Sequence, residues 1–142
     1  MTTGFTATVT MDIKASPSKV WEAITNPVMI KQYLFGTDVE TDWKVGSPII
    51  YRGQWQGKAY EDKGVILALE PEKLLKSTYW SSMGGKPDLP ENYQTVTYTL
   101  EPHGEDTTLT LTQENAVSAV DRDHSADNWK MVLEGMKKLL ER

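Results

Sequence analysis

The amino-terminal part of the chain alternates between apolar and polar side chains. Over residues 4–14, apolar positions take turns with threonine, aspartate and lysine. A period of two is the spacing of a β-strand with one buried face. The alternation therefore predicts a half-buried strand whose inward side chains are Phe5, Ala7, Val9, Met11 and Ile13.

Two short helices are predicted after this strand. The Ser-Pro pair at residues 16–17 is typical of a helix start, because serine caps free backbone N–H groups and proline suits the first helical position. An apolar stripe follows at helical spacing, formed by Val20, Trp21 and Ile24. We expect Trp21 to be buried against the edge of the sheet. The Asn-Pro pair at residues 26–27 ends this helix, and residues 28–33 predict the second.

After Gly36 the period changes to that of β-strands. Further strands are predicted over residues 37–43, 48–55, 58–69, 74–80, 93–100 and 107–113. A loop is expected at residues 81–92, and a turn at residues 102–106 makes the last two strands a hairpin. Because successive hairpins join neighbouring strands, the sheet is predicted to be antiparallel.

The end of the chain has the period of an amphipathic helix. From about residue 125 to residue 141, apolar side chains recur every three or four positions, and Ser125 or Asp123 would cap the helix. One long helix must bury its apolar stripe on the largest apolar surface available, which is the concave face of a curved sheet. The expected fold class is α+β: a single domain over residues 1–142, with about six or seven antiparallel strands around a long carboxy-terminal helix.

Composition and charge exclude several classes of protein. The chain lacks cysteine, which excludes disulfides, thiolate catalysis and cysteine-ligated zinc, and suits a reducing cytoplasm. The sequence has no apolar run long enough to span a membrane, so membrane insertion is not expected. The net charge of −5 and the absence of a basic stripe argue against nucleic acid as a partner. The two histidines, His103 and His124, are not spaced as a ligand pair, and we expect neither a metal nor another cofactor.

Four sequence strings occur in order along nearly the whole chain. Residues 15–27 read ASPSKVWEAITNP, residues 64–80 read GVILALEPEKLLKSTYW, residues 106–113 read DTTLTLTQ, and residues 128–133 read NWKMVL. Together they resemble the activator of Hsp90 ATPase homologue 1-like proteins, an SRPBCC group of the START/Bet v 1-like superfamily. The chain departs from the family at Tyr33-Leu34, where members often carry two tryptophans. The resemblance implies the helix-grip fold.

The resemblance also implies a hydrophobic cavity between the sheet and the carboxy-terminal helix. Strand parity and the start of the helix predict its lining, which is expected to comprise Tyr51, Ser77, Tyr79, Tyr98, Gln113 and Trp129. Near its mouth, beside the turn at residues 56–57 and the loop at residues 81–92, we expect Tyr33, Trp55, Tyr60 and Met83. These side chains could contact a ligand, or the polar ones could equally satisfy one another by hydrogen bonding.

Three functions follow from the resemblance. The first is non-catalytic binding of a small hydrophobic or aromatic molecule, lipids included. The second is an enzyme of the polyketide cyclase/aromatase kind, and the third is a stress-related co-chaperone module with an Hsp90-type ATPase as partner; a homodimer is compatible with each. Catalysis would need an inward ionisable residue, but the carboxylates, Asp62 among them, are expected on polar faces and turns. The sequence therefore favours ligand binding with no catalytic residue.

Overall fold

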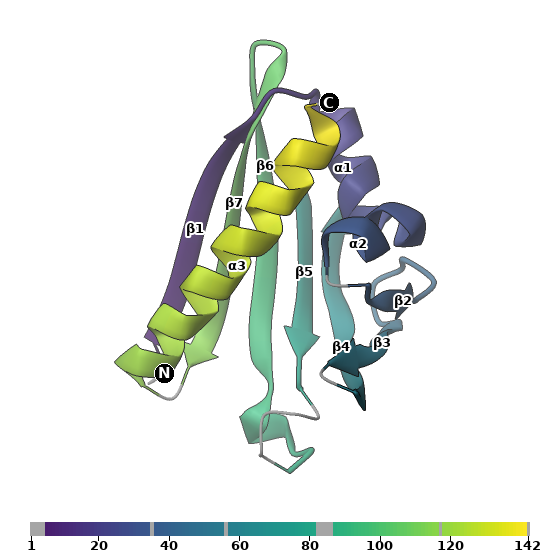
Figure 1. The fold of residues 1–142 in the computed structure, drawn as a ribbon, viewed down its shortest axis with the longest axis vertical. Helices are drawn as coiled ribbons and strands as arrows, with labels where there is room; N and C mark the ends of the chain where they lie inside the picture. Colours follow the sequence, from purple (N-terminus) through teal and green to yellow (C-terminus); the bar gives the residue numbers. More distant parts are fainter. Residues whose placement is uncertain (1–4, 35, 56, 82–86, 117, 142) are drawn as a thin grey trace.

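A seven-stranded antiparallel sheet carries one long helix on its concave face (Figure 1). The computed structural model describes residues 5–34, 36–55, 57–81, 87–116 and 118–141. The elements in chain order are β1 (Phe5–Ile13), α1 (Pro17–Thr25), α2 (Pro27–Tyr33), β2 (Asp38–Glu40), β3 (Pro48–Trp55), β4 (Lys58–Glu70), β5 (Leu74–Tyr79), the 3₁₀ turn η1 (Pro90–Asn92), β6 (Gln94–His103), β7 (Asp106–Ala116) and α3 (Ala119–Leu140). This is the helix-grip fold, and the predicted fold class is confirmed.

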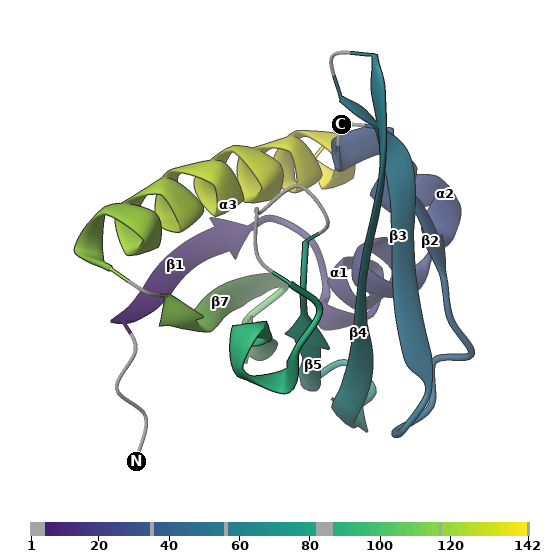
Figure 2. The same ribbon diagram turned by 90° about the horizontal axis from the view of Figure 1, so that it is seen from below.

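The topology places the first and second strands at opposite edges of the sheet. The spatial order is β1-β7-β6-β5-β4-β3-β2, and each neighbouring pair is antiparallel. The chain crosses between the two edges through α1 and α2. Figure 2 shows the resulting curvature, with α3 lying over the side that β1 and β7 form and β3 and β4 rising beside it. Within the described ranges, no helix is long and apolar enough to cross a membrane.

Polar caps set the ends of the two short helices. The Ser16 side chain accepts a hydrogen bond from the Lys19 N–H at 3.3 Å, as the Ser-Pro signal predicts. Asn26 is shared between the helices: its backbone N–H closes the last turn of α1, and its side chain accepts from the Val28 N–H at 2.9 Å to start α2. One residue thereby redirects the chain without a loop.

The long helix begins earlier than its apolar stripe indicates. It starts at Ala119, where Ser118 accepts a hydrogen bond from the Asp121 N–H at 3.1 Å, so neither Ser125 nor Asp123 is the cap. The first two turns carry mainly polar side chains, and therefore no apolar period marks them in the sequence. The predicted strand over residues 37–43 is also shorter than expected, with only Asp38–Glu40 paired to β3.

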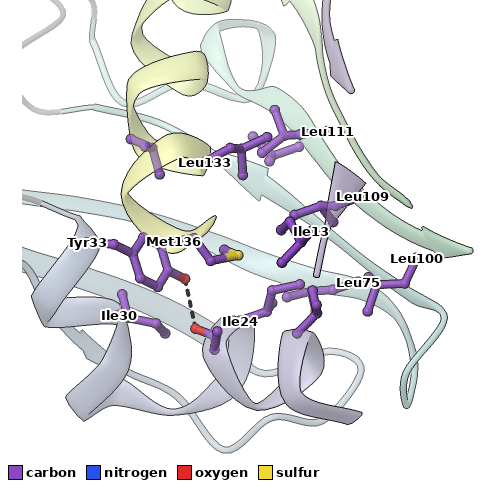
Figure 3. Close-up of a cluster of buried hydrophobic side chains, with 14 of the residues drawn as sticks. Ile13, Ile24, Ile30, Tyr33, Leu75, Leu100, Leu109, Leu111, Leu133 and Met136 are labelled. Carbon is purple, nitrogen blue, oxygen red and sulfur yellow. Dashed lines mark hydrogen bonds between the residues drawn. The ribbon is translucent and has the colours of Figure 1, made fainter. Parts of the chain in front are cut away.

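The core fills the space between one half of the sheet, α3 and the two short helices (Figure 3). Leu109 and Leu111 of β7 are fully buried, as are Leu133 and Met136 of α3. Ile24 of α1 belongs to the same cluster of buried side chains. The helix is therefore held mainly over β1 and β7, not over the middle of the sheet.

Trp21 is less buried than the sequence predicts. Its side chain is half-buried and packs on the edge of the core cluster. We expect Trp21→Ala to lower the free energy of unfolding by about 1–3 kcal/mol, below the ~3–5 kcal/mol of a fully buried aromatic side chain. Urea denaturation followed by circular dichroism measures this loss. Val28→Ala is the control, because Val28 is 69% exposed. A loss no larger than that of the control would contradict the packing of Trp21.

Candidate functional site

A cavity of about 490 Å³ lies between α3 and the half of the sheet that α3 does not cover. Since α3 packs on β1, β7 and the short helices, space remains above β3 to β6. The lining comprises Leu34, Thr37, Tyr51, Tyr60, Asp62, Tyr79, Val96, Tyr98, Gln113, Ser125, Asn128, Trp129 and Met131. Its volume falls within the range of roughly 300–1,000 Å³ that is usual for small-molecule sites.

Aromatic rings form much of this lining, and they are held in two edge-to-face pairs. Tyr51 of β3 and Tyr79 of β5 have ring centroids 5.8 Å apart with an interplanar angle of 67°. Tyr98 of β6 and Trp129 of α3 have centroids 6.2 Å apart with an angle of 86°. Edge-to-face pairs stabilise such arrangements beyond area burial alone. The rings are therefore fixed by one another as well as by their backbones.

A fifth aromatic ring depends on a glycine. Tyr60 of β4 pairs with Gly53 of β3, and a Cβ atom at Gly53 would lie 2.6 Å from the Tyr60 hydroxyl oxygen. The missing side chain lets the tyrosine ring lie across the neighbouring strand. Its hydroxyl group forms a hydrogen bond with the hydroxyl group of Thr37, another lining residue, at 2.5 Å.

Hydrogen bonds hold several of the polar lining residues in place. The indole N–H of Trp129 donates to Oε1 of Gln113 at 2.5 Å, and Nε2 of Gln113 donates to Oε1 of Gln94. The hydroxyl group of Tyr79 donates to Oδ2 of Asp62 at 2.6 Å. In the part of the chain that the structure describes, no buried side-chain nitrogen or oxygen lacks a partner. These hydrogen bonds orient the lining, and a cavity nevertheless remains.

Asp62 corrects the prediction that the carboxylates lie on polar faces and turns. It is only 7% exposed and belongs to the lining. The sequence signal was its parity, because Tyr60 and Ile66, at even-numbered positions of the same strand, also point inward. The prediction was wrong because a charged carboxylate is usually expected on the solvent-facing side of a strand. The cavity therefore contains an inward ionisable group, which the sequence analysis did not predict.

The tyrosines around Asp62 remain neutral. Burial raises the pKa of Tyr51, and the hydrogen bond with Ser77 lowers it only in part. Burial also raises the pKa of Tyr98, and burial together with the charge and hydrogen bond of Asp62 raises the pKa of Tyr79. None of these phenols ionises near neutral pH. Over the described ranges, no group of three or more acidic, histidine or cysteine side chains could hold a metal ion.

The structure brings together six of the ten residues proposed from the sequence: Tyr51, Tyr60, Tyr79, Tyr98, Gln113 and Trp129 all line the cavity. Ser77 is buried on the inward face beside Tyr51, behind the lining. Tyr33, expected near the mouth, lies in the core instead, where its hydroxyl group donates to the Ala23 carbonyl oxygen at 2.8 Å (Figure 3). Met83 and the Trp55 side chain lie outside the described residues.

Several lining residues were missed by sequence reasoning. Three of them lie on α3: Ser125, Asn128 and Met131. The apolar stripe of this helix predicts only the positions that face the core, and these three lie outside it. Leu34 and Thr37 follow α2, where neither a helical nor a strand period applies. Because the helix begins at Ala119 and not at residue 125, Ser125 lies more than one turn inside the helix, at a position that can face the sheet.

Solved structures similar to this chain have the same fold. A protein from Cytophaga hutchinsonii, ChR145, is 48% identical, with a TM-score of 0.86, and the match covers 99% of this chain and 97% of that one. CalU16 from Micromonospora echinospora is 22% identical, with a TM-score of 0.74 over 95% of this chain and 75% of that one. The Aha1 dimer from Colwellia psychrerythraea is 23% identical, with a TM-score of 0.76 over 96% of each chain.

The family comparison covers most of the chain. Among curated proteins, no match to the chain was found. The family model described as activator of Hsp90 ATPase homolog 1-like protein matches residues 14–141, which include every sequence string of the original resemblance and every described residue of the cavity lining. The chain therefore belongs to the family of activator of Hsp90 ATPase homolog 1-like proteins.

Proposed function

We propose that the protein binds a small aromatic or apolar molecule in the cavity between α3 and the sheet. The observation that carries the proposal is a space of about 490 Å³ lined by five aromatic rings. Apolar and aromatic walls with a few oriented polar groups are typical of small-molecule sites. On this proposal Tyr51, Tyr98 and Trp129 contact the apolar body of the ligand.

The hydrogen bonds within the lining support binding. They fix Trp129 through Gln113 and Tyr79 through Asp62 before any ligand enters. A side chain that is already ordered loses little conformational freedom when a ligand binds, and this favours affinity. The two possibilities raised by the sequence are thus compatible, because polar side chains that satisfy one another also shape the walls of a binding site.

A neutral fluorescent probe tests the proposal. N-phenyl-1-naphthylamine should bind the protein saturably, with a rise in its emission. Ser125→Trp should weaken its affinity by about ten-fold or more, since an indole on the lining face of α3 occupies part of the cavity. Asp127→Trp is the control, because Asp127 is exposed on the same helix outside the lining.

Two outcomes would contradict the proposal. One is the absence of saturable probe binding by the folded wild-type protein. The other is equal weakening by both tryptophan variants, since probe binding at the surface would not depend on which face of α3 carries the indole. Circular dichroism of each variant confirms that its fold is retained.

An enzyme of the polyketide cyclase kind is the second candidate, and Asp62 is the observation that favours it. A general acid or base must be positioned inside the pocket, and this carboxylate is buried there beside the Tyr79 hydroxyl group. Turnover of a bound aromatic precursor by the wild-type protein, lost in Asp62→Asn with binding retained, would distinguish an enzyme from a binding protein.

A further inference from the structure

A second, smaller pocket lies beside the cavity. It has a volume of about 250 Å³ and lies between the first turns of α3 and the segment that joins β5 to β6. Two of its lining residues, Tyr79 and Ser125, also line the cavity. The two spaces therefore meet at these side chains, and a single molecule that passes them can occupy both.

The second pocket differs from the cavity in the chemistry of its lining. Five aromatic rings line the cavity, whereas most of the residues that line the second pocket have polar side chains. In small-molecule sites, apolar walls hold the body of the ligand and a few polar groups fix its orientation. Here the apolar walls and most of the polar groups lie in neighbouring spaces. This division fits a ligand that is apolar at one end and polar at the other.

On the sheet side, hydrogen bonds to the backbone hold the walls of the second pocket. Nε1 of Trp80 and Nδ2 of Asn92 both donate to the Pro87 carbonyl oxygen, at 3.2 and 2.9 Å. Nε2 of Gln94 donates to the Asn115 carbonyl oxygen at 3.4 Å. These side chains are ordered before a ligand enters, so binding costs them little conformational freedom.

On the helix side, the second pocket is lined by Asp121, His124 and Ser125. These residues stand at positions i, i+3 and i+4 of α3, so their side chains are neighbours on the helix surface. Within the part of the chain that the structure describes, the side chains of Asp121 and His124 form no hydrogen bond or ion pair with one another or with other residues. Both are exposed, and a polar group of a ligand can replace the water around them.

The side chains on the helix side together select one kind of polar group. The Asp121 carboxylate only accepts hydrogen bonds, the His124 ring has an N–H that donates, and the Ser125 hydroxyl group does both. A hydroxyl group of a ligand can donate to the carboxylate and accept from the ring N–H at the same time. An ammonium group has no acceptor, and an ionised carboxylate has no donor.

We propose that the natural ligand is an elongated molecule with its apolar or aromatic body in the cavity and a hydroxyl-bearing end in the second pocket. This inference rests on the proposed function and names the chemical class of the ligand. The hydroxyl-bearing end contacts Asp121 and His124, and the middle of the molecule passes Tyr79 and Ser125.

The two histidines of the chain provide the first test. His124 lines the second pocket, whereas His103 is exposed at the end of β6 and belongs to neither lining. The compound 6-phenylhexan-1-ol is titrated into isotope-labelled protein, and the ring signals of both histidines are followed by NMR. The His124 signals should shift saturably, with the same dissociation constant as displacement of N-phenyl-1-naphthylamine. The His103 signals should not move.

A matched pair of compounds and a matched pair of variants provide the second test. Heptylbenzene carries a methyl group where 6-phenylhexan-1-ol carries its hydroxyl group, so the ratio of their dissociation constants isolates the effect of the hydroxyl group. His124→Phe keeps a ring but removes both ring nitrogens. It should weaken binding of the alcohol about five-fold and leave the affinity for heptylbenzene within about two-fold. His103→Phe is the control and should leave both affinities unchanged.

The outcomes separate the two proposals. If the alcohol displaces the probe without shifting the His124 signals, or if His124→Phe leaves the ratio of the two dissociation constants unchanged, the inference is overturned and the proposed function stands. If the folded protein binds neither the probe nor the two compounds, the proposed function fails and the inference fails with it. Circular dichroism confirms that both variants retain the fold.

Discussion

A chain that ends at Asp127 should not fold. The truncation removes the part of α3 that carries Val132, Leu133 and Met136, each of which is 0–1% exposed in the core. Losing a large buried side chain costs about 2–5 kcal/mol, so the loss of three is as large as the roughly 5–15 kcal/mol that stabilises a typical domain. Thermal melting followed by circular dichroism should show no cooperative transition.

The control for this truncation changes the same helix without touching its buried face. Glu134 and Lys138 are both exposed on α3. A full-length protein with Glu134→Ala and Lys138→Ala should melt cooperatively, with each substitution changing stability by no more than about 0.5 kcal/mol. A cooperative, native-like melt of the truncated chain would contradict the assignment of α3 as the element that completes the core.

Most of the sheet could be predicted because each strand has its own local pattern of alternating apolar and polar residues. Period-two alternation predicted the positions of the strands, and parity predicted that Ser77 and Gln113 point inward, where each is at most 6% exposed. The start of α3 could not be found in this way, since its first turns are polar and are held by the Ser118 cap. A helix without an apolar stripe has no periodic signal.

The cavity itself depends on tertiary geometry. Its existence follows from the position of α3 over β1 and β7, which the core side chains decide together and no single segment encodes. Asp62 shows a different limit, because its parity was correct but its polarity suggested the opposite face. Tyr33 was expected near the cavity mouth but lies in the core, where its hydroxyl group donates a hydrogen bond to the Ala23 carbonyl oxygen.

Gly64→Ala adds only one methyl group, yet we expect it to be among the most destabilising single substitutions in this protein. A Cβ atom at Gly64 would lie 1.7 Å from the Thr78 carbonyl oxygen, which is backbone of the paired strand β5. That strand cannot retreat easily, because the Val65 N–H donates to the Thr78 hydroxyl group at 2.8 Å and Lys63 pairs with Trp80. We expect a loss of about 3 kcal/mol or more in the free energy of unfolding, at the upper end of overpacking effects.

The matched control for Gly64→Ala is the same substitution at another glycine, Gly135 of α3. There a Cβ atom would lie 3.4 Å from the Tyr33 Cβ atom, which is ordinary contact, and alanine favours a helix over glycine by up to ~1 kcal/mol. Gly135→Ala should therefore leave the protein as stable as before or more so, and urea denaturation of both variants compares them. Because Gly64 and Asp62 share the inward face of β4, Gly64→Ala should also weaken binding of the neutral probe, whereas Gly135→Ala should not. Two equally small changes in stability would contradict the close approach of β4 and β5 beside the cavity.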